Sequence, residues 1–283
     1  VRPDMYSRPV VHILDEVRRM IDGGYREIVL TGVHLGHYGV DFNKGKSKEE
    51  WTRLSHLVRQ IVALDPAFRV RLSSIEATEV TRELIDMMGE FPEQVCPHLH
   101  VCLQSGSDSV LRRMKRRWGA QRFVDRCKFV EEHLHKPAFT TDVIVGFPGE
   151  TDEEFEQTMN VCRQVGFSKI HMFPFSPRRD TPAAEMTDQV AKPIKAERGR
   201  QLLELESETK REYFDQLMGE PLTMMVENID ESNVASTVAT GTSCRFAPIQ
   251  VTLPENRAPL RVGALLKVIA GQHDGQSIIA EVI

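Results

Sequence analysis

The sequence predicts an α/β protein in which a partial barrel of parallel βα units is followed by a small all-β barrel. Strand and helix patterns alternate from about residue 10 to residue 175. A charge-rich helical stretch comes next, and then short β-type runs separated by Asn, Asp, Gly and Pro. Alternating strands and helices favour a parallel sheet, closed or open. Several short strands in a small segment favour a barrel.

Composition indicates a globular protein with a reduced interior. The chain has 283 residues, a formal net charge of −5 and 41% hydrophobic residues. No apolar run approaches the roughly 18 residues that span a bilayer, so we expect no membrane partner and a cytoplasmic location. Its five cysteines are odd in number and lack the dense spacing of a disulfide scaffold. None forms a C-x-x-C or C-x-x-x-C-x-x-C group, which predicts no metal site built by this chain alone.

The βα elements follow one another in a regular order. Apolar residues at helical spacing predict a first helix over 13–21, and Gly23-Gly24 ends it. The elements predicted after it are strands at 27–31, 68–73, 99–103, 140–145 and 169–175, and helices at 54–61, 84–88, 110–114, 123–130 and 155–162. A barrel of such units begins with a strand, whereas this chain opens on a helix. We therefore expect the first strand upstream of Val1, and the chain to be N-terminally truncated.

The run 140–151 is the most informative segment. Its apolar strand leads into a turn that contains Gly146 and Gly149, and Thr151 with Glu154 forms a Thr-x-x-Glu capping box for the next helix. Ligands bind at the carboxyl ends of strands in parallel α/β folds, so exposed backbone in this turn is expected to face a ligand. An ordinary βα connection is the alternative.

Two other strand ends carry candidate binding groups. Thr31 and Gly32 offer small side chains and free backbone groups for the polar end of an amino-acid-like ligand. His34 and His37 follow as candidate ligands or bases, with solvated loop histidines as the alternative. Glu76 lies just past the next strand and can accept a hydrogen bond from a ribose hydroxyl or an ammonium group. A surface glutamate is equally compatible with its position.

The later strand ends add positive charge and aromatic rings. The segment 103–108 ends a strand in a glycine turn at a helix start, which favours an anion or polar group. A basic cluster beside it is predicted to attract phosphates, or else forms a solvated helix face; it comprises Arg112, Arg113, Lys115, Arg116, Arg117 and Arg122. Aromatic residues within 171–175 are suited to stacking on a nucleobase or to core packing. Arg178 and Arg179 follow in a loop suited to a backbone phosphate.

The last third of the sequence predicts a connector helix and a small barrel. The division is 1–186 for the βα part, 187–213 for the connector and 214–283 for the barrel. The β-type runs of the barrel are 222–227, 234–238, 249–253, 264–270 and 277–282. Barrels of this kind commonly bind nucleic acid, and a structural appendage is the alternative.

Taken in order, these segments resemble the radical S-adenosylmethionine methylthiotransferases over the whole chain. The matching stretches are 7–10, 71–76, 103–108 with 110–114, 142–151 and 173–183. The resemblance implies a partial radical-SAM-type barrel, and a TRAM-like RNA-binding domain at the C-terminus, where 241–246 falls at a short glycine-to-aromatic motif. The basic residues of that domain are few, namely Arg245, Arg257, Arg261 and Lys267.

The resemblance also implies a substrate. Residues 30–39 and 73–76 are similar to the branch that modifies N6-threonylcarbamoyladenosine at position 37 of tRNA, next to the anticodon. The branches acting on N6-isopentenyladenosine or on a ribosomal protein differ at these places and remain alternatives. A noncatalytic RNA-binding remnant of such an enzyme is a further alternative.

In this family a 4Fe-4S cluster cleaves S-adenosylmethionine, the resulting radical activates C2 of adenine, and sulfur carried on a second cluster is inserted with a methyl group. Both cysteine triplets are expected upstream of Val1, so this fragment is expected to be inactive alone. The implied partners are tRNA, a sulfur donor and an electron donor.

The resemblance implies specific site residues. For the cofactor, Thr31 and Gly32 take the methionine end, Glu76, Gln104 and Ser105 take ribose and polar contacts, and Val145, Gly146 and Phe173 take the adenine. The residues predicted to contact RNA, from the basic cluster, the loop after the last βα strand and the C-terminal domain, are Arg112, Arg113, Arg116, Arg117, Arg178, Arg179 and Arg245.

Overall fold

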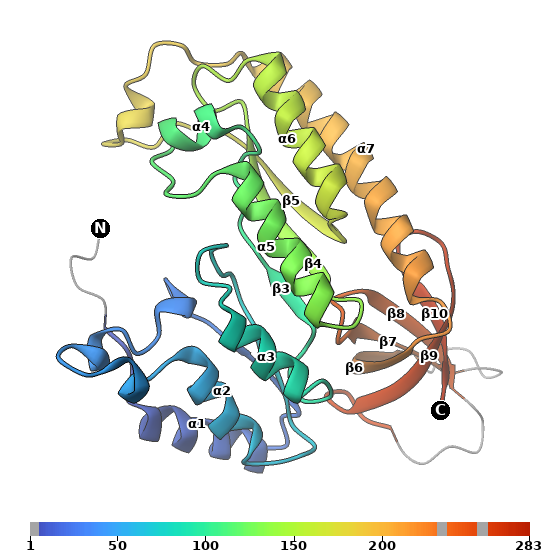
Figure 1. The fold of residues 1–283 in the computed structure, drawn as a ribbon. Coiled ribbons are helices and arrows are strands. Elements are labelled where there is room, and N and C mark those ends of the chain that lie inside the picture. Colours follow the sequence, from blue (N-terminus) through green and yellow to red (C-terminus); the bar gives the residue numbers. More distant parts are fainter. Residues whose placement is uncertain (1–5, 231–236, 254–259) are drawn as a thin grey trace.

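The computed structural model describes residues 6–230, 237–253 and 260–283. Its first part alternates strands and helices, as the sequence predicts (Figure 1). The strands are β1 Glu27–Leu30, β2 Arg69–Leu72, β3 His98–His100, β4 Ala138–Val145 and β5 Lys169–Pro174. The helices are α1 Val10–Asp22, α2 Leu54–Val62, α3 Arg82–Glu90, α4 Asp108–Arg113, α5 Ala120–His133 and α6 Asp152–Val165.

All five strands pair in parallel, which confirms the predicted sheet type, but they form two sheets. β1 pairs with β2, and β4 lies between β3 and β5. Isolated bridges connect the two sheets, one joining Val70 to Val95 and one joining Ile75 to Val101. Val95 precedes the three-residue strand β3 and Val101 follows it, so these bridges lie on either side of β3.

Helices cover one side of these strands. Successive neighbours α1, α2, α3, α5, α6 and α7 contact one another in that order along the outer side (Figure 1). Their apolar faces and the strands bury one continuous core that includes Val58, Ile85, Leu99 and Phe123. Burial of these faces is the main stabilising term, at about 25 cal/mol per Å² of apolar surface.

The helix boundaries follow local chemistry. α6 begins at the predicted capping box, in which the Thr151 hydroxyl accepts from the Glu154 amide and the Glu154 carboxylate accepts from the Thr151 amide. It ends at Gly166, which has a left-handed φ of 66° that favours glycine. These contacts satisfy backbone groups that a helix end leaves unpaired.

The C-terminal part is a long helix followed by a closed barrel. α7 runs over Lys192–Leu217, past the predicted end of the connector at 213. The barrel strands are β6 Pro221–Asp230, β7 Thr237–Ser243, β8 Pro248–Leu253, β9 Leu265–His273 and β10 Ile278–Val282, in the order β10-β8-β7-β6-β9. Part of the predicted run 234–238 lies outside the described residues. Arg257 also lies outside them. The division into three segments remains a prediction, because α7 contributes to both cores.

Buried arginines join the barrel to the first sheet. Arg69 donates to the carbonyl of Thr223 at 2.8 Å, and Arg71 donates to the carbonyl of Ser243 at 2.8 Å. Both guanidiniums also pair with the carboxylate of Glu27 on β1. A buried guanidinium needs such partners to offset the loss of water.

An aromatic contact extends the same interface. The ring of Phe246 stacks on His98 with centroids 4.6 Å apart and planes at 7°. The guanidinium of Arg71 lies over the Phe246 ring, 5.6 Å from its centroid. Phe246 adopts a φ of 61°, which is uncommon for a bulky residue, so the interface holds it in a sparsely populated conformation.

Among the helices of the described residues, none combines the length and the apolar character that crossing a bilayer requires.

Candidate functional site

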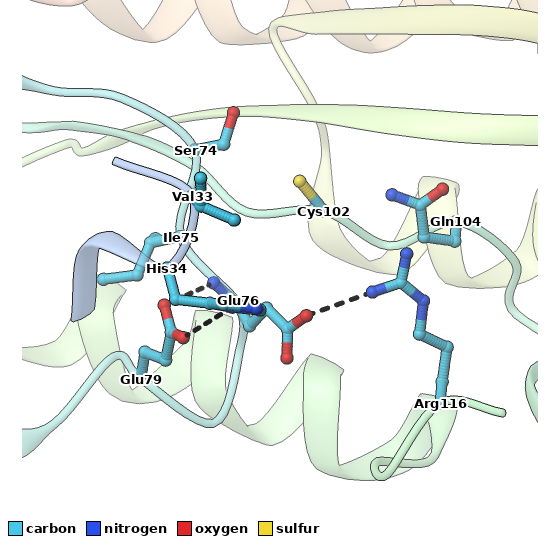
Figure 2. A pocket seen from close by; sticks show the side chains of 9 residues that line it. All are labelled: Val33, His34, Ser74, Ile75, Glu76, Glu79, Cys102, Gln104 and Arg116. Carbon is cyan, nitrogen blue, oxygen red and sulfur yellow. Dashed lines mark hydrogen bonds and ion pairs between the residues drawn. The ribbon is translucent and has the colours of Figure 1, made fainter. Parts of the chain in front are cut away.

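A cavity of about 250 Å³ opens where the chain leaves β1, β2 and β3. Its lining residues are Val33, His34, Ser74, Ile75, Glu76, Glu79, Cys102, Gln104 and Arg116 (Figure 2). Apart from Arg116, which follows α4, they come from segments at the carboxyl ends of these strands, where α/β folds place ligand sites. Two of the sequence-predicted cofactor residues, Glu76 and Gln104, are therefore brought together here.

Glu76 lies between Arg116 and Glu79 in this cavity. One carboxylate oxygen accepts a hydrogen bond from Arg116 at 3.0 Å, and its backbone amide donates to Glu79 at 3.2 Å (Figure 2). Arg116, predicted for RNA, thus reaches the cavity instead of standing on a free helix face. The ion pair is about one third exposed on both sides, so solvent screens it and a competing ligand can exchange with it.

Gln104 is held in an uncommon backbone conformation. Its φ is 65°, in the left-handed region that favours glycine. Its amide donates to the carbonyl of Asp142 at 2.8 Å, and its own carbonyl accepts from Ile144 at 2.9 Å. Two hydrogen bonds to β4 therefore fix the backbone of Gln104 while its side chain lines the cavity. Residues held in such uncommon backbone conformations are concentrated at functional sites.

A second polar cluster lies beside the cavity on β4 and on β3 with the residues just after it. His100 pairs with Asp142 at 3.4 Å, and the thiol of Cys102 lies 3.9 Å from the same carboxylate. Although burial opposes the charged form, hydrogen bonds to Asp142 and Cys102 raise the pKa of His100 to about 9. His100 and His98 both contact the Thr140 hydroxyl, at 3.0 and 2.9 Å. Burial, with the nearby Arg71 charge, lowers the pKa of His98 well below its usual value.

The glycine turn after β4 is buried, so the expectation of exposed backbone there was wrong. The Gly146 amide donates to the Glu150 carboxylate at 2.6 Å, and the Gly149 amide donates to the carbonyl of Asp188 at 2.8 Å. Arg198 of α7 pairs with Glu150 at 2.7 Å. Burial raises the pKa of Glu150 despite these contacts. Residues that follow β5 in the chain, among them Asp188 and Arg198, cover the turn. The local pattern of glycines could not predict this coverage.

The other predicted cofactor residues do not line the cavity. Thr31 and Gly32 are exposed in the loop after β1, and Phe173 on β5 is half exposed. Val145 is fully buried in the first core. The hydroxyl of Ser105 is also buried, where it lies 3.2 Å from the Thr158 hydroxyl and accepts from the Ser107 amide. These assignments remain predictions from the resemblance.

Some of the arginines predicted to contact RNA are paired or buried within the protein, and others are exposed. Arg113 makes a bidentate pair with Glu154, at 3.0 and 2.7 Å, and Arg245 is buried in the barrel. Arg112, Arg117, Arg178 and Arg179 are exposed. The exposed set is available to phosphates, whereas Arg113 already stabilises the start of α6.

The cysteines of this chain do not suit a 4Fe-4S cluster. Such clusters need several thiolates in a group. Cys96, Cys127 and Cys162 are buried, and burial raises their pKa values, to about 12 for Cys96 and Cys162. All five thiols are free.

Comparison with known proteins decides the family. The profile described as the Radical SAM superfamily matches residues 1–162, more than half of the chain. The chain belongs to the radical SAM superfamily. Members use S-adenosylmethionine and a 4Fe-4S cluster. This membership supports the predicted fold of the βα part, and the structure confirms the closed five-stranded barrel that follows it.

Curated relatives extend the comparison beyond the superfamily. The chain is 40% identical over 221 residues to "Threonylcarbamoyladenosine tRNA methylthiotransferase MtaB" of Bacillus subtilis, covering 78% of this chain and 48% of that protein. It is 35% identical over 269 residues to "tRNA-2-methylthio-N(6)-dimethylallyladenosine synthase" of Corynebacterium jeikeium, covering 95% and 52%. The radical SAM chain therefore spans about half the length of these relatives.

Among solved structures, the coproporphyrinogen III oxidase HemN of Escherichia coli, described as a radical SAM enzyme, superposes with a TM-score of 0.50 at 12% identity. The superposition covers 71% of this chain and 46% of HemN. At this identity the similarity shows the fold alone.

Proposed function

We propose that this radical SAM chain is part of an enzyme that adds a methylthio group to C2 of N6-threonylcarbamoyladenosine in tRNA. The 40% identity to a Bacillus subtilis protein of that activity carries the proposal. The similarity of residues 30–39 and 73–76 to the same branch supports it. We place the enzyme in the cytoplasm, where tRNA is modified, and its cluster ligands outside these 283 residues.

The cavity residues fit S-adenosylmethionine. Glu76 supplies a carboxylate that accepts from a ribose hydroxyl or from the methionine ammonium, and Gln104 supplies an amide that both donates and accepts. Arg116 pairs with Glu76 and can also pair with the methionine carboxylate. When bound beside a reduced cluster, S-adenosylmethionine supplies a deoxyadenosyl radical in this family. The residues of this chain bind and orient it.

The proposed RNA contacts are electrostatic. Arg112, Arg117, Arg178 and Arg179 are exposed, and the C-terminal barrel is proposed to act as the TRAM-like RNA-binding module. Contacts to phosphates release counterions, so binding that uses these arginines weakens steeply with salt. The sulfur and electron donors are further partners that the proposal requires.

A second candidate substrate is N6-dimethylallyladenosine in tRNA. Several relatives at 35–38% identity are named as synthases of the methylthiolated form of this nucleoside. One of them, from Aquifex aeolicus, is 38% identical over 221 residues. The two candidates share the cavity and differ in the side chain on the adenine that the enzyme must accept.

The test is mass spectrometry of tRNA nucleosides from a strain in which the coding sequence is disrupted. We expect 2-methylthio-N6-threonylcarbamoyladenosine to disappear and its unmethylthiolated precursor to accumulate. Loss of the methylthiolated dimethylallyl nucleoside instead would establish the second candidate. Unchanged levels of both nucleosides would refute the proposal.

Complementation with site variants links the activity to the cavity. We expect Glu76→Gln to lower the methylthiolated nucleoside at least about 10-fold, because the neutral amide pairs poorly with a cationic group. Glu49→Gln, at an exposed position outside the cavity, is the matched control and should complement fully. Equal complementation by both variants would remove Glu76 from the site.

A further inference from the structure

Two histidines and a buried glutamate converge at one edge of the cavity. His34 directly precedes the short 3-10 helix Leu35–His37 after β1, and His37 is its last residue. Side chains three residues apart in such a turn lie on the same side. Their rings are 5.6 Å apart, and both Nδ1 atoms face one oxygen of Glu79, Oε1, at 3.7 and 3.4 Å. Figure 2 shows Glu79 directed toward His34 at the cavity wall.

Glu79 is oriented by the backbone and left with one unsatisfied oxygen. Its side chain is 2% exposed. Oε2 accepts from the amides of Gly36 and Glu76, each at 3.2 Å. Among the residues that the structure describes, none donates a hydrogen bond to Oε1. A buried carboxylate oxygen without a partner is costly, so this atom indicates a missing positive group.

The spacing of the three donor atoms suits a metal ion. All three lie within 4.8 Å of one another. For metal–ligand bonds of about 2.1 Å, a tetrahedral site separates its ligand atoms by about 3.4 Å. The Nδ1 to Oε1 separations are 3.4 Å for His37 and 3.7 Å for His34, close to this value.

Gly36 allows this close approach. A Cβ at position 36 would lie 2.3 Å from the Cβ of Glu79 and 2.8 Å from its Oε2. No other residue type therefore fits between the two histidines without displacing the glutamate. Backbone amides that fix a ligand carboxylate are typical of the surroundings of metal sites.

We propose that His34, His37 and Glu79 bind one divalent transition-metal ion, with its remaining coordination positions open to the cavity. Imidazole and carboxylate donors suit Zn²⁺ and its first-row neighbours. The histidines are about half exposed, so an ion can enter from solvent. The ion neutralises the buried carboxylate and offers its free positions to an oxygen or nitrogen donor in the cavity. Cysteine spacing predicts no metal site, but this one uses no cysteine.

The proposal is tested by titrating the full chain with Co²⁺ and Zn²⁺ at equilibrium. The chain is first purified with a chelator, which is then removed. We expect one equivalent of Co²⁺ to give visible d–d absorption without the sulfur-to-cobalt charge-transfer band, and Zn²⁺ to displace it. His34→Ala and His37→Ala should each weaken binding at least about 10-fold. Glu79→Gln should weaken it similarly while keeping an acceptor for Gly36 and Glu76.

Two controls separate this site from others. His135→Ala removes an exposed histidine that pairs with one carboxylate, Glu220, and should leave binding unchanged. Cys102→Ala alters the second candidate group, His100, Cys102 and Asp142. The proposal is overturned if the chain binds no stoichiometric metal, if binding survives both His34→Ala and His37→Ala, or if Cys102→Ala abolishes it. The readout is metal binding, so its outcome is independent of the methylthiotransferase assignment.

Discussion

His98 and His100 share the hydroxyl of Thr140 but respond to pH in opposite senses. Burial keeps His98 neutral, so its contribution to stability is complete above its usual pKa and is lost as the pH falls below about 6.5. His100 is held charged by Asp142 and Cys102, so its contribution is complete below about pH 6.5 and is lost as the pH rises through about 9. The protonated His100 ring donates to the Thr140 hydroxyl, which the neutral His98 ring also contacts.

The raised pKa of His100 predicts how replacing its ring changes stability at different pH values. In His100→Gln the free energy of unfolding should lose on the order of 2 kcal/mol at pH 6.5 and much less at pH 10, because wild type has already lost the charge there. Urea denaturation at several pH values measures it. His133→Gln, at an exposed position, is the control. An equal loss at both pH values would show that packing, not charge, is responsible.

Sequence predicted part of the site at the residue scale. Glu76 and Gln104 were found because each follows a strand end, and both line the cavity. Glu79 and Cys102 were missed as lining residues. Glu79 has a weak signal, since it lies three residues after Glu76 in the same turn. Its pairing with His34 depends on β1 and β2 lying side by side, which no local pattern encodes.

At the scale of elements, α7 holds the turn between β4 and α6. Arg198 pairs with the buried Glu150 and also reaches Asp152 at 2.7 Å. The Glu150 carboxylate in turn accepts from the Gly146 amide. A connector predicted from its charge-rich sequence is thus part of the packing around the turn.

Loss of this arginine should unfold the turn. Arg198→Met leaves Glu150 buried without its counter-charge, and the free energy of unfolding should fall by about 3–5 kcal/mol. Chemical denaturation measures the change. Arg200→Met, on the same helix with exposed partners Glu197 and Glu204, should leave stability within error. A similar effect of both substitutions would contradict a specific role for Arg198.

Sequence patterns predicted nearly every element with its type. Helical spacing and capping residues are local signals, so α1, α6 and the strand β4 were all found. The buried turn at 146–150 was misjudged because residues 188, 195 and 198, which cover it, are distant in sequence. The split into two sheets was not predicted either, since it depends on how β2 and β3 lie relative to each other in the fold.

At the scale of the whole molecule, the barrel and the first sheet share buried charges. Arg71 connects Glu27 to the carbonyls of Ser243 and Cys244 and lies over Phe246. Each part therefore satisfies polar groups of the other. We expect the two parts to unfold together.

Tryptophan fluorescence can distinguish the parts, because Trp51 and Trp118 both lie in the βα part and 214–283 contains none. In wild type, thermal midpoints from fluorescence and from far-ultraviolet circular dichroism should coincide. In Arg71→Met we expect destabilisation by about 3 kcal/mol and separation of the two midpoints. Arg59→Met, which alters an exposed pair with Glu90, should keep them together. Separate midpoints in wild type would contradict the coupling.

The Arg69 contact also constrains the order of events during synthesis. Its acceptor, the carbonyl of Thr223, is made 154 residues later, and the acceptor of Arg71 at Ser243 is 172 residues away. While the ribosome makes the βα part, these two guanidiniums have Glu27 but no barrel carbonyls. The first sheet therefore reaches its final, dehydrated state only after translation has passed β7.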